Sequence, residues 1–409
     1  MRIGIFTDTY PPYINGVSTS IAMLEKALIK QGHQVFIVTV NSEKYSYENE
    51  EKIIRIPGIP IGIYDYRLTG VYPLRAISKI KEWNLDIIHS HTEFGVGTFA
   101  RIIAKQLNIP LVHTYHTMYE DYIHYITKGY FLAPGKKIVE YLTKFYCDKT
   151  ATELIVPTKK AYDLFKEKYK FDRNVNIVPT GIELERFYKE NNELVETNKI
   201  KKELNIEAND FVIISVGRLA AEKSFELLIE GHTEIVKKNK HAKLLIIGDG
   251  PDSEKYKELA SKLKIRENVI FTGKVPWEEI HKYYQLATVF ATASRTETQG
   301  LTVIEAMAAS IAVICADDES FKEVVIDNLN GKLFSDQKDY VKVVLELMND
   351  KEKIQKMGKQ ARISSEVHSS RCFAEQVLAV YKIAIKPNMK KTTFFGKLKN
   401  VVKKGFNGK

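Results

Sequence analysis

Hydrophobic residues in this chain form short continuous runs that alternate with longer stretches in which they recur every three or four positions. The continuous runs predict buried β-strands, and the periodic stretches, such as 17–31 and 95–107, predict helices with one apolar face. Strands that are apolar throughout and alternate with helices are typical of parallel sheets covered on both faces. The predicted strands are 3–6, 35–40, 53–56, 86–89, 110–114, 153–156, 176–178, 211–217, 242–248, 269–272, 289–293 and 312–315.

This alternation occurs in two halves that meet at a polar segment rich in Lys, Glu and Asn. We therefore expect an α/β protein with two doubly wound, Rossmann-like domains that face each other across a cleft. In such domains ligands bind at the carboxyl ends of the strands, so each loop that follows a strand is a candidate site. The predicted divisions are a first domain at 1–190, a linker at 191–209, a second domain at 210–370, a helix at 371–387 that returns to the first domain, and a basic amphipathic tail at 388–409.

Two acids, Glu297 and Glu305, are separated by seven residues where a predicted strand gives way to a helix. Gly300 lies at the expected helix start, where backbone N–H groups and the positive end of the helix dipole attract an anion such as a diphosphate. Glu305, inside the helix, is placed to accept hydrogen bonds from hydroxyl groups such as those of a ribose. The alternative is a pair of solvated glutamates, but together with the other loops the spacing favours a site for a nucleotide-linked sugar.

Two loops of the first half carry candidate chemistry. The segment 7–17 follows the first strand, and Gly16 allows its backbone to approach a phosphate, but the segment lacks the GxGxxG pattern of nicotinamide dinucleotide sites. The segment 112–122 places His116, Glu120 and Asp121 among tyrosines at a strand end. For the segment 7–17 the alternative is a plain loop. For the segment 112–122 the alternative is histidines that are paired with other groups for structural reasons.

In the second half, Arg218 and Lys223 follow the end of a predicted strand. A guanidinium fork and a point charge at the end of a buried strand suit a diphosphate, although an isolated Arg/Lys pair is more often a solvated surface. Residues 248–251, Gly-Asp-Gly-Pro, allow a close backbone approach after the next strand and are a weak signal by themselves.

The composition narrows the class of protein. Three scattered cysteines without metal-ligand spacing argue against a disulfide scaffold or a zinc site and favour a reducing compartment. The first residues resemble a strand rather than a signal peptide, and no apolar run reaches the ~18–20 residues of a membrane helix, so we expect a cytoplasmic protein that does not span a bilayer. Eight lysines and no acid in residues 386–409 supply most of the net charge of +10, which disfavours nucleic-acid binding by the nearly neutral remainder.

The C-terminal tail predicts a membrane attachment. Its apolar residues, beginning with Phe394, Phe395 and Leu398, have helical spacing, and lysines such as Lys403 and Lys404 flank them. A helix of this kind is too short to span a bilayer but suits the interface of an anionic one. A disordered solubilising tail is the alternative.

The segment 64–83 is a second candidate for a membrane surface. It combines aromatic residues, among them Tyr66 and Trp83, with basic residues that include Arg67 and Arg75. Such a mixture is typical of interfacial segments, and an ordinary exposed helix is the alternative.

Together these motifs resemble those of the retaining glycosyltransferases of glycosyltransferase family 4, which have the two-domain GT-B fold. The resemblance covers residues 1 to about 385. It rests on the glycine loop at 15–17, on Arg218 with Lys223, on residues 248–251 and on the spacing of the two glutamates. Within the family the chain is similar to bacterial glycolipid synthases that glycosylate diacylglycerol, through residues 91–94, 113–125, 156–158 and 179–183. Gln299 departs from the Phe that many relatives carry before the glycine, although Gln also occurs among the glycolipid synthases.

The resemblance implies a role for each motif. The cations would neutralise the donor diphosphate, Glu305 would bind the ribose, Glu297 would lie near the sugar, and His116 would orient a sugar hydroxyl; no enzymic nucleophile is assigned. The implied catalytic residues are His116, Glu297, Arg218 and Lys223; the implied donor-binding residues are Gly16, Arg218, Lys223, Glu297, Gly300, Leu301 and Glu305; and the implied acceptor or membrane contacts are Tyr66, Arg67, Arg75, Tyr119, Phe394, Phe395, Leu398, Lys403 and Lys404.

The resemblance also implies the substrates. Because two cationic side chains can take the place of a metal at the diphosphate, no cofactor and no divalent ion is expected to be required. The expected function is transfer of a hexose from a UDP-sugar, UDP-glucose, to diacylglycerol or monoglycosyl-diacylglycerol on the inner face of the cell membrane, with the first domain facing the acceptor. The alternatives are transfer to a polysaccharide or another lipid, and a non-catalytic membrane protein that binds nucleotide sugars.

Overall fold

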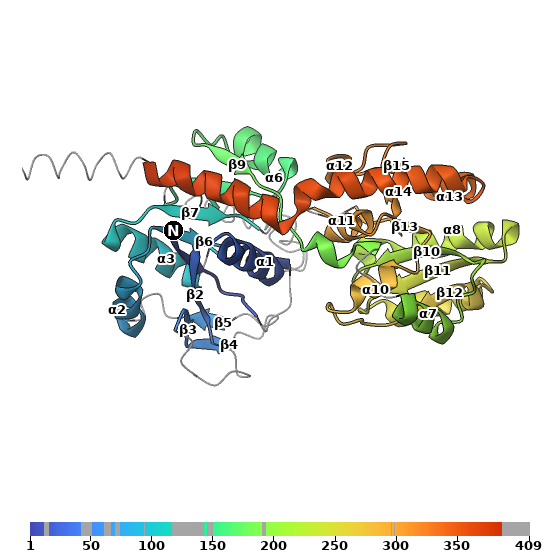
Figure 1. Ribbon diagram of the computed structural model, residues 1–409, viewed down its shortest axis with the longest axis horizontal. Helices are drawn as coiled ribbons and strands as arrows, with labels where there is room; N and C mark the ends of the chain where they lie inside the picture. The colour runs from blue at the N-terminus through green and yellow to red at the C-terminus, as the bar shows by residue number, and fades with distance from the viewer. Residues whose placement is uncertain are drawn as a thin grey trace, which may run out of the picture. The chain divides into compact units, whose positions relative to one another are not determined.

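The structure, a computed structural model, describes residues 1–11, 16–41, 51–60, 67–69, 74–93, 95–116, 143–144, 147, 150–189, 194–295, 297 and 299–386. The chain forms two compact units, one built from Met1–Gly181 and the chain from Ser370 onward, the other from Ile182–Ser369. Each unit contains a parallel sheet covered by helices (Figure 1). The predicted pair of Rossmann-like domains is therefore confirmed.

The first unit alternates strands and helices along the chain. Its strands are β1 (Arg2–Phe6), β2 (Gln34–Val40), β3 (Ile53–Ile56), β4 (Gly58–Pro60), β5 (Arg67–Thr69), β6 (Ile87–Ser90), β7 (Leu111–Thr114), β8 (Glu153–Val156) and β9 (Val175–Ile177). Its helices are α1 (Gly16–Lys30), α2 (Leu74–Glu82), α3 (Gly95–Leu107), α6 (Lys159–Asp163), the π-helix η2 (Leu164–Lys168) and a C-terminal helix at 370–386.

Seven of these strands form a parallel sheet in the order β3-β2-β1-β6-β7-β8-β9, while β4 and β5 form a separate antiparallel pair. The chain winds outward in one direction from β1 to β3 and in the other from β6 to β9. The carboxyl ends of β1 and β6 therefore flank the point where the winding reverses, which is where ligands bind in open α/β sheets.

Alternation along β1 sends apolar side chains to two separate cores. Ile3 and Ile5 belong to the core that contains α1 and the helix at 370–386, whereas Phe6 belongs to the core that contains α2 and α3. The helix at 370–386 lies against this unit through a stripe of apolar residues at helical spacing, drawn in red in Figure 1.

Trp83 does not face a membrane, so the prediction for the segment 64–83 is wrong for this residue. Trp83 is only 5% exposed, and its ring centroid lies 4.9 Å from that of Phe36. The apolar stripe of α2, which includes the buried Ile80, packs on the sheet and closes this core. The backbone of Arg67 begins β5 and that of Arg75 lies in α2, while their side chains and all of Tyr66 lie outside the described residues.

The second unit contains a six-stranded parallel sheet in the order β12-β11-β10-β13-β14-β15. Its strands are β10 (Phe211–Val216), β11 (Ala242–Ile247), β12 (Val269–Phe271), β13 (Val289–Thr292), β14 (Ala312–Ala316) and β15 (Gly331–Phe334). Its helices are η3 (Leu184–Arg186), α7 (Leu194–Glu203), η5 (Ala221–Lys223), α8 (Phe225–Lys238), α9 (Ser253–Lys262), η6 (Arg266–Asn268), α10 (Ile280–Tyr284), α11 (Leu301–Ala308), α12 (Glu319–Lys322), α13 (Gln337–Met348), α14 (Lys351–Ser365) and η7 (Glu366–His368).

β15 and α7 are two of the elements of this unit that were not expected from the sequence. β15 has a glycine and a lysine among its four residues, which weakens the apolar run that marks a buried strand. Residues 194–203, within the segment expected to be a linker, form α7, and the nearby Ile206 is buried in the core of the unit. A few apolar residues dispersed among charged ones are enough to hold this segment on the domain.

No helix in the described part of the chain is both long and apolar enough to cross a bilayer.

Candidate active site

The strand ends of the second unit position the predicted donor-binding residues. β10 ends at Val216, and Arg218 follows two residues later with an exposed side chain. Lys223 ends the short helix η5 that continues from this loop. Glu297 lies on the loop that follows β13, the neighbour of β10 in the sheet.

Lys223 and Glu297 are brought together across 74 positions of sequence. The Lys223 ammonium donates a hydrogen bond to Oε1 of Glu297, and the two side chains are 24% and 21% exposed. An ion pair that keeps this much access to solvent costs little desolvation and is readily exchanged for another anion. The arrangement therefore holds a lysine cation beside a carboxylate at the carboxyl end of the sheet.

The loop around Glu297 is fixed by its neighbours. The Glu297 carbonyl accepts a hydrogen bond of 2.7 Å from Oγ of Ser320 on α12. Gly300 has φ = 64°, and a Cβ at this position would lie 2.7 Å from the ring of Phe321, so both its backbone conformation and its neighbour require glycine. Gly300 precedes Leu301, the first residue of α11, so the predicted glycine at the helix start has a structural reason as well as a proposed ligand role.

Glu305 lies one turn into α11 and is half-buried. Its Oε2 accepts a hydrogen bond of 2.7 Å from the hydroxyl of Tyr284 on α10. Burial raises the pKa of Glu305 to about 7, while the bond from Tyr284 and the positive charge of Arg186 oppose this rise. Tyr284 was not identified from the sequence, where it is one of many apolar or aromatic positions in a helical segment.

In the first unit, polar groups gather where β6 and β7 end. His113 Nδ1 lies 2.9 Å from the carbonyl oxygen of Ser90, which can only accept, so Nδ1 of His113 carries a proton. Its Nε2 lies 3.2 Å from Oε1 of Glu93, which is itself 4% exposed. Burial lowers the pKa of His113, and the nearby Arg101 charge lowers it further.

His116, the predicted catalytic histidine, belongs to this cluster. Its Nε2 lies 2.9 Å from Nδ1 of His91, and the two rings stack with centroids 5.2 Å apart. Nε2 of His91 is buried without a hydrogen-bond partner among the described residues. A buried orphan N–H costs more than a buried orphan lone pair, so the His91 proton is best placed on Nδ1, donated to His116. The remaining His116 proton then lies on its Nδ1.

Burial disfavours the charged forms of His89, His91 and His116 in this cluster. Burial lowers the pKa of His116 to about 4 and holds the pKa values of His89 and His91 well below their usual range. His89 is satisfied on both sides, by the Tyr381 hydroxyl and the Thr114 hydroxyl, each at 2.7 Å. His116 is therefore suited to bond a hydroxyl group without adding charge.

Asp8, at the end of β1, is a residue that sequence reasoning missed. Its Oδ1 accepts a hydrogen bond of 2.9 Å from the Val96 N–H at the start of α3, and its own N–H donates to Oγ1 of Thr92 at 3.2 Å. Burial raises the pKa of Asp8 to about 6, although the hydrogen bonds that its carboxyl group makes with the Thr92 side chain and the Val96 N–H oppose this rise. Polar residues directly after two neighbouring strands, β1 and β6, were the signal that could have found Asp8 and Glu93.

Of the remaining predicted site residues, Gly16 lies in the described part of the chain and several others do not. Gly16 begins α1 and is exposed, and a Cβ there would lie within 4 Å of none of the described residues. The predicted residues that lie outside the described part of the chain are Tyr66, Tyr119, Phe394, Phe395, Leu398, Lys403 and Lys404.

One group of described residues has the composition of a metal site. Ligand atoms of Glu207, Asp210 and His241 lie within 4.8 Å of one another at the surface of the second unit. His241 Nδ1 lies 3.2 Å from Oδ1 of Asp210, so these two side chains also make an ordinary hydrogen bond to each other. None of the predicted donor-site residues belongs to it.

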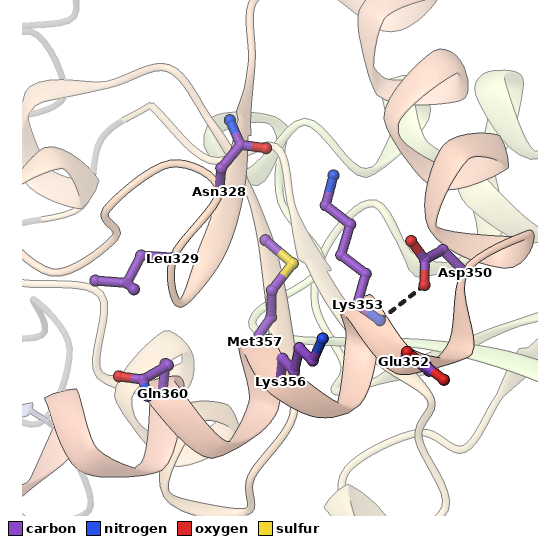
Figure 2. A pocket seen from close by; sticks show the side chains of 8 residues that line it. All are labelled: Asn328, Leu329, Asp350, Glu352, Lys353, Lys356, Met357 and Gln360. Atoms are coloured by element: carbon purple, nitrogen blue, oxygen red, sulfur yellow. Dashed lines mark hydrogen bonds between the residues drawn. The ribbon is translucent and has the colours of Figure 1, made fainter.

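A surface pocket of about 340 Å³ lies elsewhere in the second unit (Figure 2). Asp350 caps α14 beside it by accepting a hydrogen bond of 2.8 Å from the Lys353 N–H. No predicted site residue lines this pocket, whose walls are Asn328, Leu329, Asp350, Glu352, Lys353, Lys356, Met357 and Gln360.

Comparison with known proteins shows that the chain matches two glycosyltransferase family models. The family model described as Glycosyltransferase Family 4 matches residues 14–186, and that described as Glycosyl transferases group 1 matches residues 196–364. The crystal structure of Anabaena HepE in complex with UDP has the same fold, with a TM-score of 0.74 and 16% identity, covering 93% of this chain and all of that one. The fold and the two family models define a glycosyltransferase with the GT-B fold.

Sequence relatives narrow the assignment. The chain is 37% identical to the alpha-monoglucosyldiacylglycerol synthase of Acholeplasma laidlawii, covering 96% of this chain and 99% of the relative. It is 36% identical to the alpha-monoglucosyldiacylglycerol synthase of Streptococcus pneumoniae, covering 85% of this chain and 78% of the relative. The chain therefore belongs to glycosyltransferase family 4, as its motifs predicted, and it is similar over nearly its whole length to these glycolipid synthases.

Proposed function

We propose that this protein is a retaining glycosyltransferase that transfers glucose from UDP-glucose to diacylglycerol at a membrane surface. The observation that carries the proposal is the near full-length identity of 37% with a monoglucosyldiacylglycerol synthase. HepE, which shares the fold, has been crystallised with UDP-glucose, which supports the same class of donor. The site residues of both units are chemically suited to such a reaction.

In the proposed reaction, the bond between sugar C1 and the diphosphate oxygen breaks, and its electron pair leaves with UDP. Lys223 exchanges its ion pair with Glu297 for the diphosphate, and Arg218 adds a second cation as negative charge develops. The acceptor hydroxyl oxygen bonds to C1 on the face that UDP leaves, and its proton passes to the departing phosphate. Glu297, released from the lysine, bonds a sugar hydroxyl and stabilises positive charge at the sugar ring.

His116 orients a hydroxyl of the transferred sugar in this proposal. Because burial lowers its pKa to about 4, the ring is neutral at pH 7 and offers an N–H on one side while its other nitrogen is held by His91. Cationic side chains take the charge-neutralising role, so we propose that no divalent metal is required and expect the transfer rate to be unchanged by EDTA.

The first experiment measures transfer of radiolabelled sugar into lipid. Mixed anionic vesicles would contain either diacylglycerol or monoglucosyl-diacylglycerol, with UDP-glucose or UDP-galactose as donor and EDTA in parallel. We expect labelled lipid from UDP-glucose with diacylglycerol. Label only with monoglucosyl-diacylglycerol, or only from UDP-galactose, would reassign the acceptor or the donor. UDP-glucose hydrolysis without labelled lipid would move the acceptor to a polysaccharide or another lipid.

The attachment to the inner face of the membrane is also proposed, from the charge and spacing of the tail. Deleting residues 388–409 should weaken sedimentation with anionic vesicles, and the difference should shrink as salt is raised because the lysines act through screened charge. A matched variant that keeps the apolar residues but replaces Lys403 and Lys404 by Gln separates charge from apolar burial. Sedimentation equal to that of the full chain would contradict the attachment.

A further inference from the structure

Tyr284 is a buried side chain of the second unit that the proposed mechanism does not yet use. It ends α10 and has no exposed surface. Its ring meets Phe187 edge-on at 5.5 Å and stacks with Phe290 at 6.3 Å, centroid to centroid. Two aromatic neighbours on different elements leave the ring a single orientation, which fixes where its hydroxyl points.

That hydroxyl points at Glu305. It lies 2.7 Å from Oε2 of Glu305 and 3.2 Å from the carbonyl oxygen of Thr302, one turn earlier on α11. A phenol has one proton to donate, and the shorter contact is to the more basic oxygen. Tyr284 therefore donates to Glu305 and holds one oxygen of its carboxylate against the core, which leaves Oε1 for another donor.

We propose that Tyr284 is a positioning residue that orients the Glu305 carboxylate and favours its ionised form, which accepts hydrogen bonds from the ribose of a nucleotide sugar. This inference rests on the proposed function, in which Glu305 contacts the ribose. It adds a residue from α10 to a donor site that the sequence located only on α11 and the loops.

The groups facing Glu305 determine the sign of the expected effect. Burial favours the protonated acid, whereas the Tyr284 bond and the charge of Arg186 favour the carboxylate, and together they leave the pKa of Glu305 at about 7. A protonated acid loses one of its acceptor positions for a ribose diol. Donor affinity should therefore rise as pH increases through about 7, and removing the Tyr284 hydroxyl should move that rise to higher pH.

The alternative is that the Tyr284 hydroxyl only satisfies a buried polar group. In that case its loss would alter stability but not the pH dependence of donor binding. The two roles are separated by measuring affinity as a function of pH rather than stability alone.

The experiment uses isothermal titration calorimetry of UDP-glucose, without acceptor lipid, from pH 5.5 to 9. UDP-glucose is the suitable probe because it lacks the terminal phosphate monoester of UDP, which titrates near pH 6. The proteins are the wild type, Tyr284→Phe and the matched control Tyr283→Phe. Tyr283 is the preceding residue of α10 and only partly buried at the edge of the same core. Thermal melts verify that each variant is folded.

We expect the midpoint of the affinity rise to move up by about one pH unit in Tyr284→Phe, since a hydrogen bond to a charged group is worth this much. Tyr283→Phe should retain the wild-type midpoint. In steady-state assays near pH 7, Tyr284→Phe should raise the KM for UDP-glucose several-fold more than it lowers kcat. An unchanged midpoint in a folded Tyr284→Phe would overturn the inference while leaving the proposed function intact.

A second variant keeps the inference testable if Tyr284→Phe does not fold. Glu305→Gln keeps an acceptor for the Tyr284 hydroxyl but cannot titrate, so its affinity should not depend on pH between 6 and 8. Persistence of the wild-type pH dependence in Glu305→Gln would contradict the role of this pair. Failure of the wild type itself to bind UDP-glucose would instead overturn the proposed function, and the inference with it.

Discussion

The two units share an architecture, but the carboxyl ends of their sheets carry different kinds of polar side chain. In the first unit, the ends of β6 and β7 carry a buried cluster of histidines whose pKa values are lowered by burial. In the second unit, the ends of β10 and β13 carry a partly exposed ion pair, Lys223 with Glu297. The histidine cluster therefore favours uncharged hydrogen-bonding groups, and the ion pair supplies charge.

This difference follows from burial rather than from residue type alone. A histidine beside water titrates near pH 6.5, and only its removal from solvent keeps it uncharged at lower pH. A lysine and a glutamate that keep contact with water retain their charges at low cost. A transferase needs both environments, because its donor carries a charged diphosphate while its sugar hydroxyls are neutral.

The largest expected effect comes from a substitution at the charged strand ends of the second unit, where Lys223 pairs with Glu297. Lys223→Ala should lower the rate of glucosyl transfer by about 10²- to 10³-fold, as expected for loss of a preorganised charge that stabilises the leaving group. The fold should persist because the side chain lies at the surface of the loop. Initial rates with UDP-glucose and lipid vesicles measure the effect, and Lys238→Ala, an exposed lysine on α8, is the matched control. A rate near that of the wild type would remove Lys223 from the donor site.

A smaller effect is expected at the histidine cluster of the first unit. His116→Ala should lower kcat by about 10- to 100-fold, the worth of one or two hydrogen bonds to a neutral hydroxyl. His241→Ala, which removes a largely exposed histidine of the second unit, should leave kcat unchanged. A loss in His116→Ala as large as in Lys223→Ala would contradict the division between a charged ion pair and uncharged histidines.

The smallest predicted effect concerns stability against acid. For buried histidines the folded pKa lies below the unfolded value near 6.5, so the unfolded chain binds more protons and stability falls as pH drops from 6.5 towards about 4. Asp8 and Glu305, whose pKa values are raised, act in the opposite sense over their own ranges. Each histidine that stays neutral in the folded state lowers the free energy of unfolding by up to ~1.4 kcal/mol per pH unit between pH 6.5 and about 4.

Because the first unit holds more such histidines around one site, it should lose more of its free energy of unfolding than the second between pH 7 and pH 5. Hydrogen-exchange mass spectrometry over a urea series at both pH values, corrected for intrinsic exchange, resolves the two units. Equal losses would show that the cluster is hydrated enough to titrate normally. The histidines with lowered pKa values are His33, His89, His91, His113 and His116 in the first unit, against His232, His281 and His368 in the second.

Local sequence patterns were sufficient to identify a residue whose type is required by the fold as well as by the proposed site. Gly300 was predicted from its place at a helix start, and the structure confirms a left-handed conformation that glycine adopts without strain. The segment around Trp83 shows the limit, because an aromatic residue among basic ones has the same composition whether it faces a membrane or a core. The packing of Trp83 against Phe36, which lies 47 positions earlier, decided between these.

The same limit applies to the candidate site. The pairing of Lys223 with Glu297 joins loops after two neighbouring strands, and the bond from Tyr284 to Glu305 joins two helices. Neither spacing has a local periodicity, so neither pair could be read from the sequence. The roles assigned to these residues remain predictions for the experiments above.

The sequence by itself determined the alternation of strands and helices, the two parallel sheets and the family, because apolar periodicity and glycine positions act over a few residues. Only the tertiary structure decided which polar side chains are desolvated and what each of them contacts. Burial and electrostatic interaction depend on distances between segments remote along the chain. The pKa values of His116 and Glu305 therefore follow from the fold, although the residues themselves could be named from the sequence.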